Sequence, residues 1–294
     1  MTQIGLPHHS TGKVRDLYEV DHDRMLIVAS DRISVFDVVL PDEIPDKGCA
    51  LTALSTFWFE QTAELWPNHL VSSDPTDFPE TAGPEVAGRA MLVRAAVPIR
   101  LECIARGYLF GSAWSEYESS GTIGGAAAPA GLRRAERLAE PVFTTTTKAE
   151  SGHDESLTAS GAAELVGAEI YEQVEEATLR IYHHAAAHAA SCGLILADTK
   201  LEFGSIDRQV VVIDEMCTPD SSRYWPANEY VVGGSPPSFD KQYVRDHYLK
   251  IGWDQTPPAP PMPRNVIDGT RARYLESYEM LTGRSFDEWF GVDE

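Results

Sequence analysis

Basic residues are scarce in this 294-residue chain: 24 Lys and Arg stand against 45 Asp and Glu, a formal net charge of −21 at pH 7. Nucleic-acid binding depends on basic surface that neutralises phosphates, so this balance excludes a general DNA- or RNA-binding protein. Cysteines are also few: the four are widely separated and form no CxxC pair. Their spacing argues against a zinc ribbon or a disulfide framework and predicts reduced, mostly buried thiols.

Long apolar runs are missing as well. No run approaches the ~18 apolar residues of a membrane span, and residues 1–20 contain no basic segment followed by an apolar one. We therefore expect a cytoplasmic protein without membrane contact. The hydrophobic share of 43% is close to that of average soluble domains. The length corresponds to one large domain or two closely packed ones, so we expect two lobes and a cleft.

The first hundred residues mix strand and helix patterns. Segments rich in β-branched and aromatic residues predict strands over Val14 to Val20, Met25 to Ala29, Val35 to Leu40 and Ala90 to Val97. Residues 51–65 differ, because their apolar positions recur at helical spacing and predict an amphipathic helix. We therefore expect a mixed α and β structure for this part of the chain.

The later part of the chain contains a loop, a long helix and a hairpin. Residues 121–131, GTIGGAAAPAG, predict a mobile loop, and apolar periodicity predicts a helix over residues 160–191. Two apolar strands, Leu194 to Phe203 and Gln209 to Met216, follow in the pattern of an antiparallel hairpin. The tract TPPAPPMP at 256–263 indicates an extended linker before a C-terminal helix.

The first strand of the hairpin places Asp198, Lys200 and Glu202 on one face, because side chains alternate between the faces of a strand. If the connecting loop has an odd number of residues, Lys200 pairs with Asp214 and four charged groups share that surface. In that register the core-facing residues are Leu201, Phe203, Val211 and Ile213, and the apolar residues beneath the charges are Val210 and Val212. This set suits a magnesium nucleotide, although a solvated strand face with ion pairs explains it too.

Two predicted turns carry groups that suit anions. The turn at 218–220 precedes Ser222 and Arg223, whose hydroxyl and planar guanidinium can bind a phosphate or a carboxylate. Near the N-terminus, Gly12 would let the backbone approach a phosphate that Lys13 neutralises, although the segment is not a P-loop. An ordinary capped turn with one surface cation is the alternative for both segments.

Further polar segments lie between the predicted strands. Arg106 and Ser112 flank two glycines and suggest another anion site, with a buried aromatic segment and one surface arginine as the alternative. The segment SDRISVFD at 30–37, which ends at Asp37, has a density of polar groups that suits substrate recognition or a capped turn. Residues 143–155 are equally polar and are a second candidate loop.

Seven of these segments in series closely resemble the SAICAR synthetase family (phosphoribosylaminoimidazole-succinocarboxamide synthases) of purine biosynthesis. From about residue 12 to residue 246 they are GKVRDLY, SDRISVFD, ARGYLFGSAWSEY, TTTTKAESGHDE, LADTKLEFG, DEMCTPDSSRYW and SFDKQYVRD. The resemblance implies an α+β fold with an ATP-grasp-like nucleotide cleft between two lobes. The implied divisions are 1–95 for a β-rich N-terminal lobe, 96–255 for a larger α+β lobe with the hairpin, and 256–294 for a Pro-rich linker and a C-terminal helix packed on the body.

The resemblance also implies an activity, that of an ATP-dependent ligase. Such an enzyme condenses L-aspartate with the carboxylate of carboxyaminoimidazole ribonucleotide (CAIR) to give SAICAR, ADP and phosphate. A carboxylate is a poor electrophile, so ATP is expected to convert it to an acyl phosphate, which depends on positioning and charge neutralisation. The implied cofactor is Mg²⁺, the implied partners are small molecules without nucleic acid or membrane, and the chain would be a monomer or a small homo-oligomer.

The family's site residues carry over onto matching positions of this sequence. The implied catalytic residues are Lys13, Lys200 and Asp198. The implied ATP site consists of Lys13, Val93, Arg94, Ala95, Lys200, Glu202 and Asp214, of which Glu202 and Asp214 would hold Mg²⁺. The implied substrate-binding residues are Asp37, Arg106, Ser112, Asp154, Ser222, Arg223, Lys241 and Arg245.

Two other functions fit part of this pattern. A kinase for a small carboxylate or hydroxyl substrate would retain Lys13, Glu202 and Asp214 but would need no aspartate pocket. A nucleotide-binding regulatory protein would retain the motifs without activity, and the intact carboxylate pair argues against it. Incubation with ATP and CAIR, with and without L-aspartate, separates a ligase from a kinase.

Overall fold

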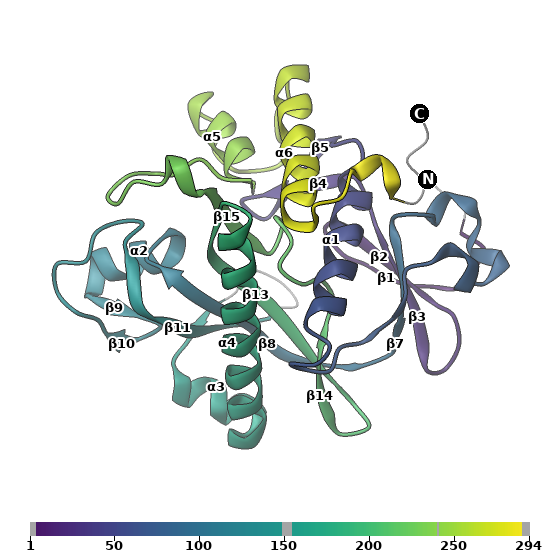
Figure 1. The fold of residues 1–294 in the computed structure, drawn as a ribbon, viewed down its shortest axis with the longest axis horizontal. Coiled ribbons are helices and arrows are strands. Elements are labelled where there is room, and N and C mark those ends of the chain that lie inside the picture. Colours follow the sequence, from purple (N-terminus) through teal and green to yellow (C-terminus); the bar gives the residue numbers. More distant parts are fainter. Residues whose placement is uncertain (1–3, 149–154, 240, 290–294) are drawn as a thin grey trace.

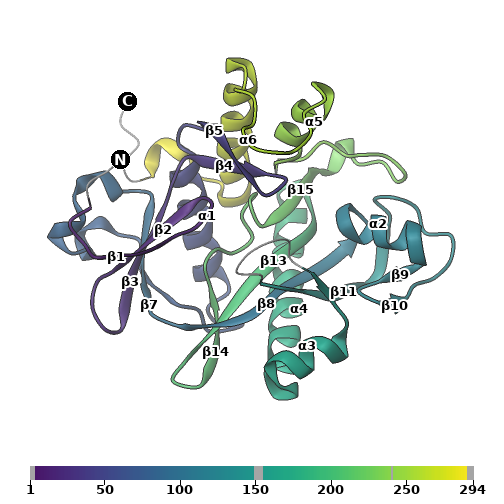
Figure 2. The ribbon, with the colours of Figure 1, turned by 180° about the vertical axis from the view of Figure 1, so that it is seen from behind.

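Two antiparallel sheets organise the computed structural model, which describes residues 4–148, 155–239 and 241–289. The first sheet has the strand order β1 (His8–Thr11), β2 (Arg15–Glu19), β3 (Arg24–Ala29), β7 (Ala90–Arg94) and β6 (Leu70–Ser72). The second has the order β12 (Ser156–Leu157), β11 (Arg137–Thr147), β8 (Val97–Tyr108), β13 (Leu194–Ile206) and β14 (Gln209–Ile213), and β15 (Ser222–Pro226) also pairs with β13. Figures 1 and 2 show the two sheets beside each other, so the fold is α+β.

Six α-helices lie within the described ranges. They are α1 (Lys47–Gln61), α2 (Gly111–Ser120), α3 (Ala159–Val166), α4 (Ala168–Ser191), α5 (Gln242–Lys250) and α6 (Arg264–Thr282). Single 3₁₀ turns occupy Pro75–Asp77, Glu80–Ala82, Pro84–Val86, Ala227–Glu229 and Phe286–Glu288. Two small ribbons pair β4 (Arg32–Val35) with β5 (Val38–Glu43), and β9 (Thr122–Ile123) with β10 (Ala126–Ala127). Among these helices none is both long and apolar enough to cross a membrane.

Helix α1 is buried on nearly all sides, whereas the sequence predicted an amphipathic helix over residues 51–65. The helix begins at Lys47, and the side chains of Lys47, Thr52 and Ser55 are buried together with its apolar residues. It packs against β3, β7 and α6 (Figure 1). Because α6 comes from the other end of the chain, its cover over α1 could not be read from the local sequence pattern.

Three other predicted segments differ from the structure. The predicted strand over Val35 to Leu40 is interrupted by a turn, because Phe36 and Asp37 adopt φ angles of 51° and 62° between β4 and β5. Val35 and residues 38–40 do lie in strands. The predicted long helix is two helices, α3 and α4, which meet at Gly167 with a φ of 91°. The predicted loop over residues 121–131 contains the β9–β10 ribbon, whose backbone N–H groups at Gly124 and Gly125 donate to Glu116.

The hairpin of β13 and β14 has a two-residue loop, so the predicted register with an odd loop is wrong. Glu202 pairs with Ile213, and Asp207 and Arg208 form the turn with φ angles of 52° and 68°. Two successive positive φ angles define a primed turn, which matches the right-handed twist of the strands. Neither turn residue is glycine, and this is why the sequence did not reveal the turn.

The altered register exchanges the two faces of β14, because a shift of one residue reverses every side chain. Val210 and Val212, predicted to lie beneath the charged groups, belong to the main hydrophobic core. Val211 and Ile213, predicted to face that core, pack instead against Ala96. Ile213, and not Val210 or Val212, is therefore the apolar residue of β14 that lies beside the charged groups of β13.

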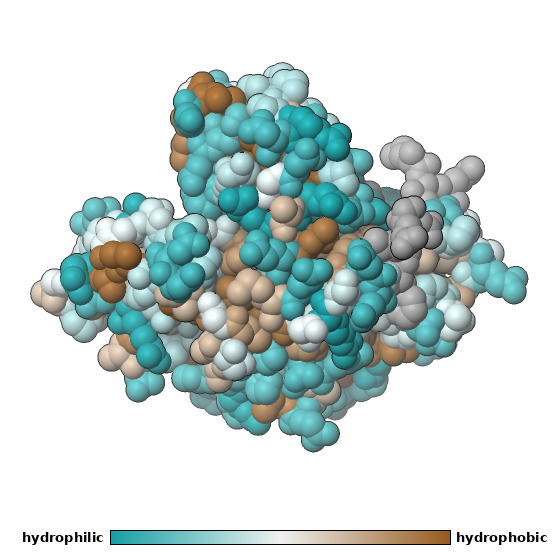
Figure 3. All heavy atoms as spheres, turned by 45° about the horizontal axis from the view of Figure 1, so that its top comes forward, coloured by the Kyte–Doolittle hydropathy of each residue, from teal (hydrophilic) through white to brown (hydrophobic). Residues whose placement is uncertain are grey.

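Helix α4 covers one face of the second sheet and leaves the other face to the site. Ala177, Ile181 and Ala185 of α4 share the main core with Leu201 and Phe203 of β13. The alternate residues of β13 therefore point away from α4. Most large apolar side chains are buried in this way, and the surface in Figure 3 is predominantly hydrophilic, with hydrophobic residues in small separate areas.

Backbone hydrogen bonds join the two sheets where β14 meets the segment before β6. The N–H of Val212 donates to Pro67 O at 3.0 Å, and the N–H of His69 donates to Val212 O at 3.1 Å, around a parallel bridge between Asn68 and Val212. The N–H of Arg94 in β7 then donates to His69 O at 2.8 Å. Residues 67–69, defined here as the inter-sheet bridge, thus tie the edge of the second sheet to the first.

Candidate active site

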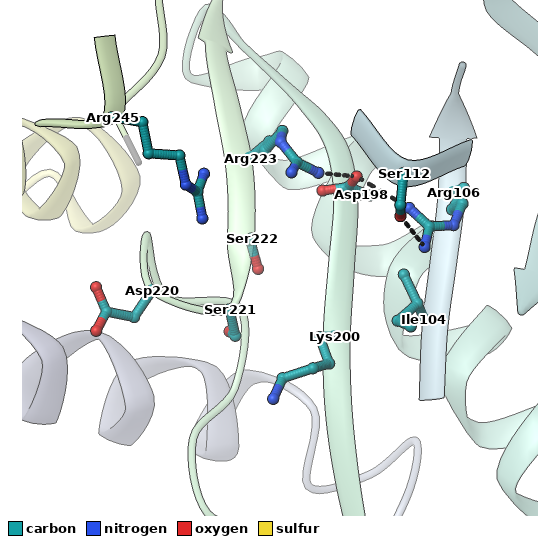
Figure 4. Close-up of a pocket in the computed structure, with 10 residues that line it drawn as sticks. All are labelled: Ile104, Arg106, Ser112, Asp198, Lys200, Asp220, Ser221, Ser222, Arg223 and Arg245. Atoms are coloured by element: carbon teal, nitrogen blue, oxygen red, sulfur yellow. Dashed lines mark hydrogen bonds and ion pairs between the residues drawn. The ribbon is translucent and has the colours of Figure 1, made fainter. Parts of the chain in front are cut away.

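Two cavities adjoin each other on the charged face of the second sheet. The large cavity, of about 560 Å³, is lined by the β1–β2 turn, by β2, β3 and β7, and by the charged face of β13. The small cavity, of about 180 Å³, is lined by residues of β8, β13, β15, α2 and α5. Lys200 and Asp220 line both cavities, and this place is defined here as the junction. Figure 4 shows Lys200 and Arg245 extending toward the middle of the small cavity.

The first sheet gives the large cavity a mostly apolar wall. Leu17, Met25, Ile27 and Val93 contribute to this wall from β2, β3 and β7. Their alternation within each strand turns them toward the cavity and the main core. A flat aromatic group such as a nucleobase fits against a wall of this kind.

The backbone of residues 93–95, which the family resemblance places in the ATP site as the edge that reads adenine, is partly engaged within the protein. The N–H of Arg94 donates to His69 O, and the N–H of Ala95 donates to Asp23 O at 2.7 Å. Val93 and Arg94 line the large cavity, but beyond them Ala96 lines it and Ala95 does not. A bound base would therefore contact this edge through groups other than those two N–H donors.

The second sheet gives the large cavity a charged wall built around Lys200. Glu102 of β8 pairs directly with Glu202 of β13, and the Lys200 ammonium contacts both carboxylates, at 3.4 Å for Glu202. Lys148 also contacts Glu202. Burial raises the pKa of Glu202, but Lys200 and Lys148 outweigh it and hold that pKa below its ordinary value. Glu202 is therefore a carboxylate at neutral pH.

Asp214 joins Glu202 in lining the large cavity, although the observed register alone would turn it toward the core. It follows the last residue of β14 and adopts a φ of 65°, which redirects the chain and the side chain. Arg15 reaches across from the first sheet and donates to both carboxylate oxygens of Asp214 at 3.2 Å, and it also pairs with Glu215. Burial raises the pKa of Asp214 to about 6 against the opposing effect of Arg15.

The oxygen atoms on this wall fit a magnesium ion that is shared with a nucleotide. Mg²⁺ in phosphoryl-transfer sites usually takes one or two carboxylates together with substrate phosphates. Glu202 and Asp214 supply two carboxylates on one cavity. Across the described part of the chain, no three or more His, Cys, Asp or Glu side chains form a closed metal cage. The chemistry of the donor set therefore fits a nucleotide-dependent ion and not a permanent structural metal.

The small cavity concentrates arginines around one buried carboxylate. Arg106, Arg223 and Arg245 line it together with Ser112, Ser222 and Asp198 (Figure 4). Arg223 pairs with Asp198, and the Arg106 guanidinium lies 3.5 Å from the same carboxylate. Together with Lys200, the three guanidinium groups face two carboxylates, Asp198 and Asp220, which leaves an excess of positive charge. The planar donor sets of the arginines suit a phosphate group.

Gly111 gives Arg223 its place beside the start of α2. A Cβ atom at this position would lie 2.9 Å from an Nη atom of Arg223, and the φ of 60° already disfavours any other residue. The guanidinium also lies over the ring of Phe110, 5.6 Å from its centroid. Arg223 therefore takes its direction from two neighbours. Gly111 leaves room for its guanidinium, and the ring of Phe110 lies against it.

We expect Gly111→Ala to weaken binding of a phosphate-bearing substrate in the small cavity about tenfold, because its methyl group displaces Arg223. Steady-state kinetics would give this as a higher KM. Gly121→Ala is a matched control, since Gly121 lies at the other end of α2 with a φ of 71° and has open space at its Cβ position. Both variants should lose about 1 kcal/mol of stability from the strained φ. Equal KM values for the two variants would contradict the role given to Gly111.

The remaining predicted residues occupy three different places. Lys13 lines the large cavity from the β1–β2 turn and pairs at 2.5 Å with Asp37, which lies in the β4–β5 turn and not in the lining of either cavity. Lys241 lines the large cavity and lies 3.1 Å from Asp220, so it stands at the junction and not among the arginines. Asp154 lies outside the described residues.

Several cavity residues were missed by the sequence reasoning. Glu102 could have been found, because Glu102, Ile104 and Arg106 repeat on β8 the period-two pattern that was noticed on β13. The segment around Lys47 reads as an ordinary surface turn before a helix, although its side chain is fully buried. Lys47 lines neither cavity, whereas the ionisable residues of the large cavity that were also missed are Arg15, His69, Lys148, Glu215 and Asp220.

His69 lies in the inter-sheet bridge and is buried, with 3% exposure. Its ring is hydrogen-bonded to the backbone of Asp214, packs against Phe59, and has a buried Nε2 atom without a hydrogen-bond partner. Burial lowers the pKa of His69 from 6.5 to about 3, so the ring is neutral in the folded protein. The unfolded chain therefore binds a proton at His69 that the folded protein does not bind.

This difference predicts that the protein loses stability through His69 as the pH falls from 6.5 toward about 3. The loss is about 1.4 kcal/mol per pH unit for one proton. Urea unfolding at several pH values gives the change in unfolding free energy per pH unit. This change should be smaller for His69→Gln than for the wild type by the amount just given. Identical slopes would mean that His69 is protonated in the folded state or exposed.

The chain is similar to known proteins over nearly its whole length. The SAICAR synthetase family model matches residues 8–260. A phosphoribosylaminoimidazole-succinocarboxamide synthase of Xylella fastidiosa is 48% identical, and one of Xanthomonas oryzae is 50% identical, each covering 96% of both chains. The solved SAICAR synthase of Saccharomyces cerevisiae, described as complexed with SAICAR, superposes with a TM-score of 0.88, 39% identity and 97% coverage of both chains.

Proposed function

This chain belongs to the SAICAR synthetase family, and from that premise we propose how its two cavities carry out the reaction. The chain is an ATP-dependent ligase that condenses L-aspartate with the carboxylate of CAIR to give SAICAR, ADP and phosphate. The observation that carries the proposal is the junction, where a cavity with an apolar wall and paired carboxylates meets a cavity rich in arginine. One nucleotide and one phosphorylated substrate can therefore meet end to end.

The large cavity takes ATP. Its apolar wall at Leu17, Met25, Ile27 and Val93 receives the adenine, which places the triphosphate along the charged wall toward the junction. Lys13 at the rim and Lys200 at the junction neutralise the phosphate oxygens. Since ion pairs already hold Lys200 beside Glu202, little reorganisation is required when the nucleotide arrives.

Mg²⁺ is the implied cofactor, and Glu202 and Asp214 would hold it against the ATP phosphates. When bound, the ion supplies charge neutralisation for the transferred phosphoryl group. Cations of this chain also contact the two carboxylates, Lys148 at Glu202 and Arg15 at Asp214. Both carboxylates line the large cavity beside these cations.

The small cavity takes CAIR through its phosphate. Arg106, Arg223 and Arg245, with the hydroxyls of Ser112 and Ser222, surround the phosphate, and this directs the imidazole carboxylate toward Lys200 at the junction. Attack of that carboxylate on the γ-phosphorus of ATP forms an acyl phosphate and releases ADP. The amine of L-aspartate then attacks the acyl carbon, loses a proton and releases phosphate, which leaves the amide bond of SAICAR.

A cytoplasmic location agrees with the thiols of the chain. Cys49, Cys103, Cys192 and Cys217 are all free, as the sequence predicted, and three of them are buried. Free thiols persist in reducing compartments. We therefore place the enzyme in the cytoplasm.

Product analysis tests the proposed function. The purified chain is incubated with ATP, Mg²⁺ and CAIR, with and without L-aspartate, and ADP and SAICAR are quantified by chromatography and mass spectrometry. We expect equal amounts of SAICAR and ADP when L-aspartate is present. Stoichiometric release of ADP without L-aspartate and without amide formation would indicate a kinase and would overturn the proposal.

A further inference from the structure

A buried carboxylate with three partners lies at the junction. Asp220 has a side chain that is 1% exposed and accepts from Lys47 Nζ at 2.8 Å and from the Tyr274 hydroxyl at 2.5 Å. Lys241 Nζ lies 3.1 Å from the same Asp220 oxygen that Lys47 contacts. These three partners come from α1, from α6 and from the residue before α5, which are far apart in the sequence.

The cluster of Lys47, Asp220, Lys241 and Tyr274 contains two cationic side chains and one carboxylate. Two lysines share one carboxylate, and the Asp220 pKa is held below its ordinary value by Lys241 and Lys47 despite the opposing effect of burial. Lys47 is fully buried, with its ammonium 5.5 Å from the centre of the Tyr274 ring, so it cannot reach a ligand. Lys241 lines the large cavity. Lys241 is therefore the cation of this cluster that a ligand in the large cavity can contact.

Tyr274 belongs to the C-terminal helix, which supplies no residue to the lining of the two cavities. Its ring is fully buried, and its hydroxyl donates to Asp220 Oδ1, while the two lysines contact Oδ2. The tyrosine thus fixes the rotation of the carboxylate by holding the oxygen that the lysines do not use. A carboxylate fixed in this way determines where the ammonium of Lys241 lies.

We propose that Lys47, Asp220 and Tyr274 are positioning residues that hold the Lys241 ammonium at the junction, so that the C-terminal helix takes part in the reaction. The inference rests on the proposed function, in which the phosphoryl group passes from ATP to CAIR at this place. A fixed cation there stabilises the charge that develops on the transferred group without reorganisation. The effect of the three residues should therefore appear in kcat and should depend on Lys241.

The substitution Tyr274→Phe tests the role of the hydroxyl, because it removes one oxygen and keeps the buried ring. We expect kcat to fall about tenfold, with the KM for CAIR close to the wild-type value. Tyr278→Phe is the matched control, since Tyr278 is a buried tyrosine one turn further along α6 and lines neither cavity. Thermal unfolding of both variants would show whether stability changes equally. A wild-type kcat for Tyr274→Phe would overturn the inference.

A double-mutant cycle tests whether the tyrosine acts through Lys241. We expect Lys241→Met to lower kcat on its own and Tyr274→Phe to cause no further loss in that background. A full tenfold loss in both backgrounds would show that Tyr274 acts independently of Lys241, which contradicts the proposal. The failures are distinguishable, because a wild-type chain that forms no SAICAR refutes the proposed function, whereas an active wild type with an unaffected variant refutes only this inference.

Discussion

Replacing Glu202 by glutamine is expected to lower kcat about a thousandfold while the fold is preserved. Glutamine keeps the shape of the side chain but removes the negative charge that would hold Mg²⁺ beside the ATP phosphates. It also leaves Lys148 without the carboxylate that it contacts, whereas Lys200 retains Glu102. Steady-state assays of SAICAR formation at saturating ATP and CAIR would measure the loss, and circular dichroism would verify the fold.

The matched control for this variant is Glu172→Gln, the same chemical change at an exposed position of α4. Its kcat should equal that of the wild type. Binding of a magnesium nucleotide, measured by calorimetry, provides a readout apart from turnover, and we expect Glu202→Gln to bind ADP much more weakly when Mg²⁺ is present. A Glu202→Gln enzyme with full activity would remove Glu202 from the metal site.

Replacing Arg223 by alanine is expected to raise the KM for CAIR about a hundredfold, which corresponds to ~2.7 kcal/mol of binding. Arg223 lines the small cavity, where its planar donor set faces the place proposed for the CAIR phosphate. Its loss also leaves the buried Asp198 with Arg106 at 3.5 Å, so more negative charge faces an incoming phosphate. Because the large cavity is untouched, the KM for ATP should stay close to the wild-type value.

Arg133→Ala serves as the control for Arg223→Ala. Arg133 pairs with Glu136 and keeps 65% of its side chain exposed, and an ion pair of this kind contributes little to stability. Both KM values of this variant should match the wild type. If Arg223→Ala raises the KM for ATP and leaves the KM for CAIR unchanged, our assignment is wrong. The small cavity would then bind ATP and the large cavity CAIR.

The motifs predicted the family, the α+β class and the hairpin, but the hairpin register followed from a turn that they did not reveal. Asp207 and Arg208 both adopt positive φ, a conformation usually associated with glycine or asparagine, so no residue indicated a two-residue loop. Glu202 and Asp214 nevertheless line one cavity, because Asp214 also leaves the strand conformation. The predicted pair was thus brought together by a backbone feature that alternation cannot predict.

Long-range partners account for the rest of what was missed. A lysine at the start of a helix normally faces solvent, and Lys47 is buried only because Asp220, far away in the sequence, lies within 2.8 Å of its ammonium. His69 likewise has no local signal, since its position follows from the contact between β14 and the first sheet. Predictions from spacing therefore succeeded within one strand and failed where three elements meet.

The inter-sheet bridge and the rim of the large cavity differ in how firmly they are held. Three backbone hydrogen bonds hold residues 67–69 between Val212 and Arg94, and separating the sheets along this seam would expose those groups. By contrast, the exposed Lys13–Asp37 pair at the rim, with side chains 54% and 49% accessible, is easily broken. We therefore expect any widening of the large cavity to break the Lys13–Asp37 pair at the rim before it opens the seam.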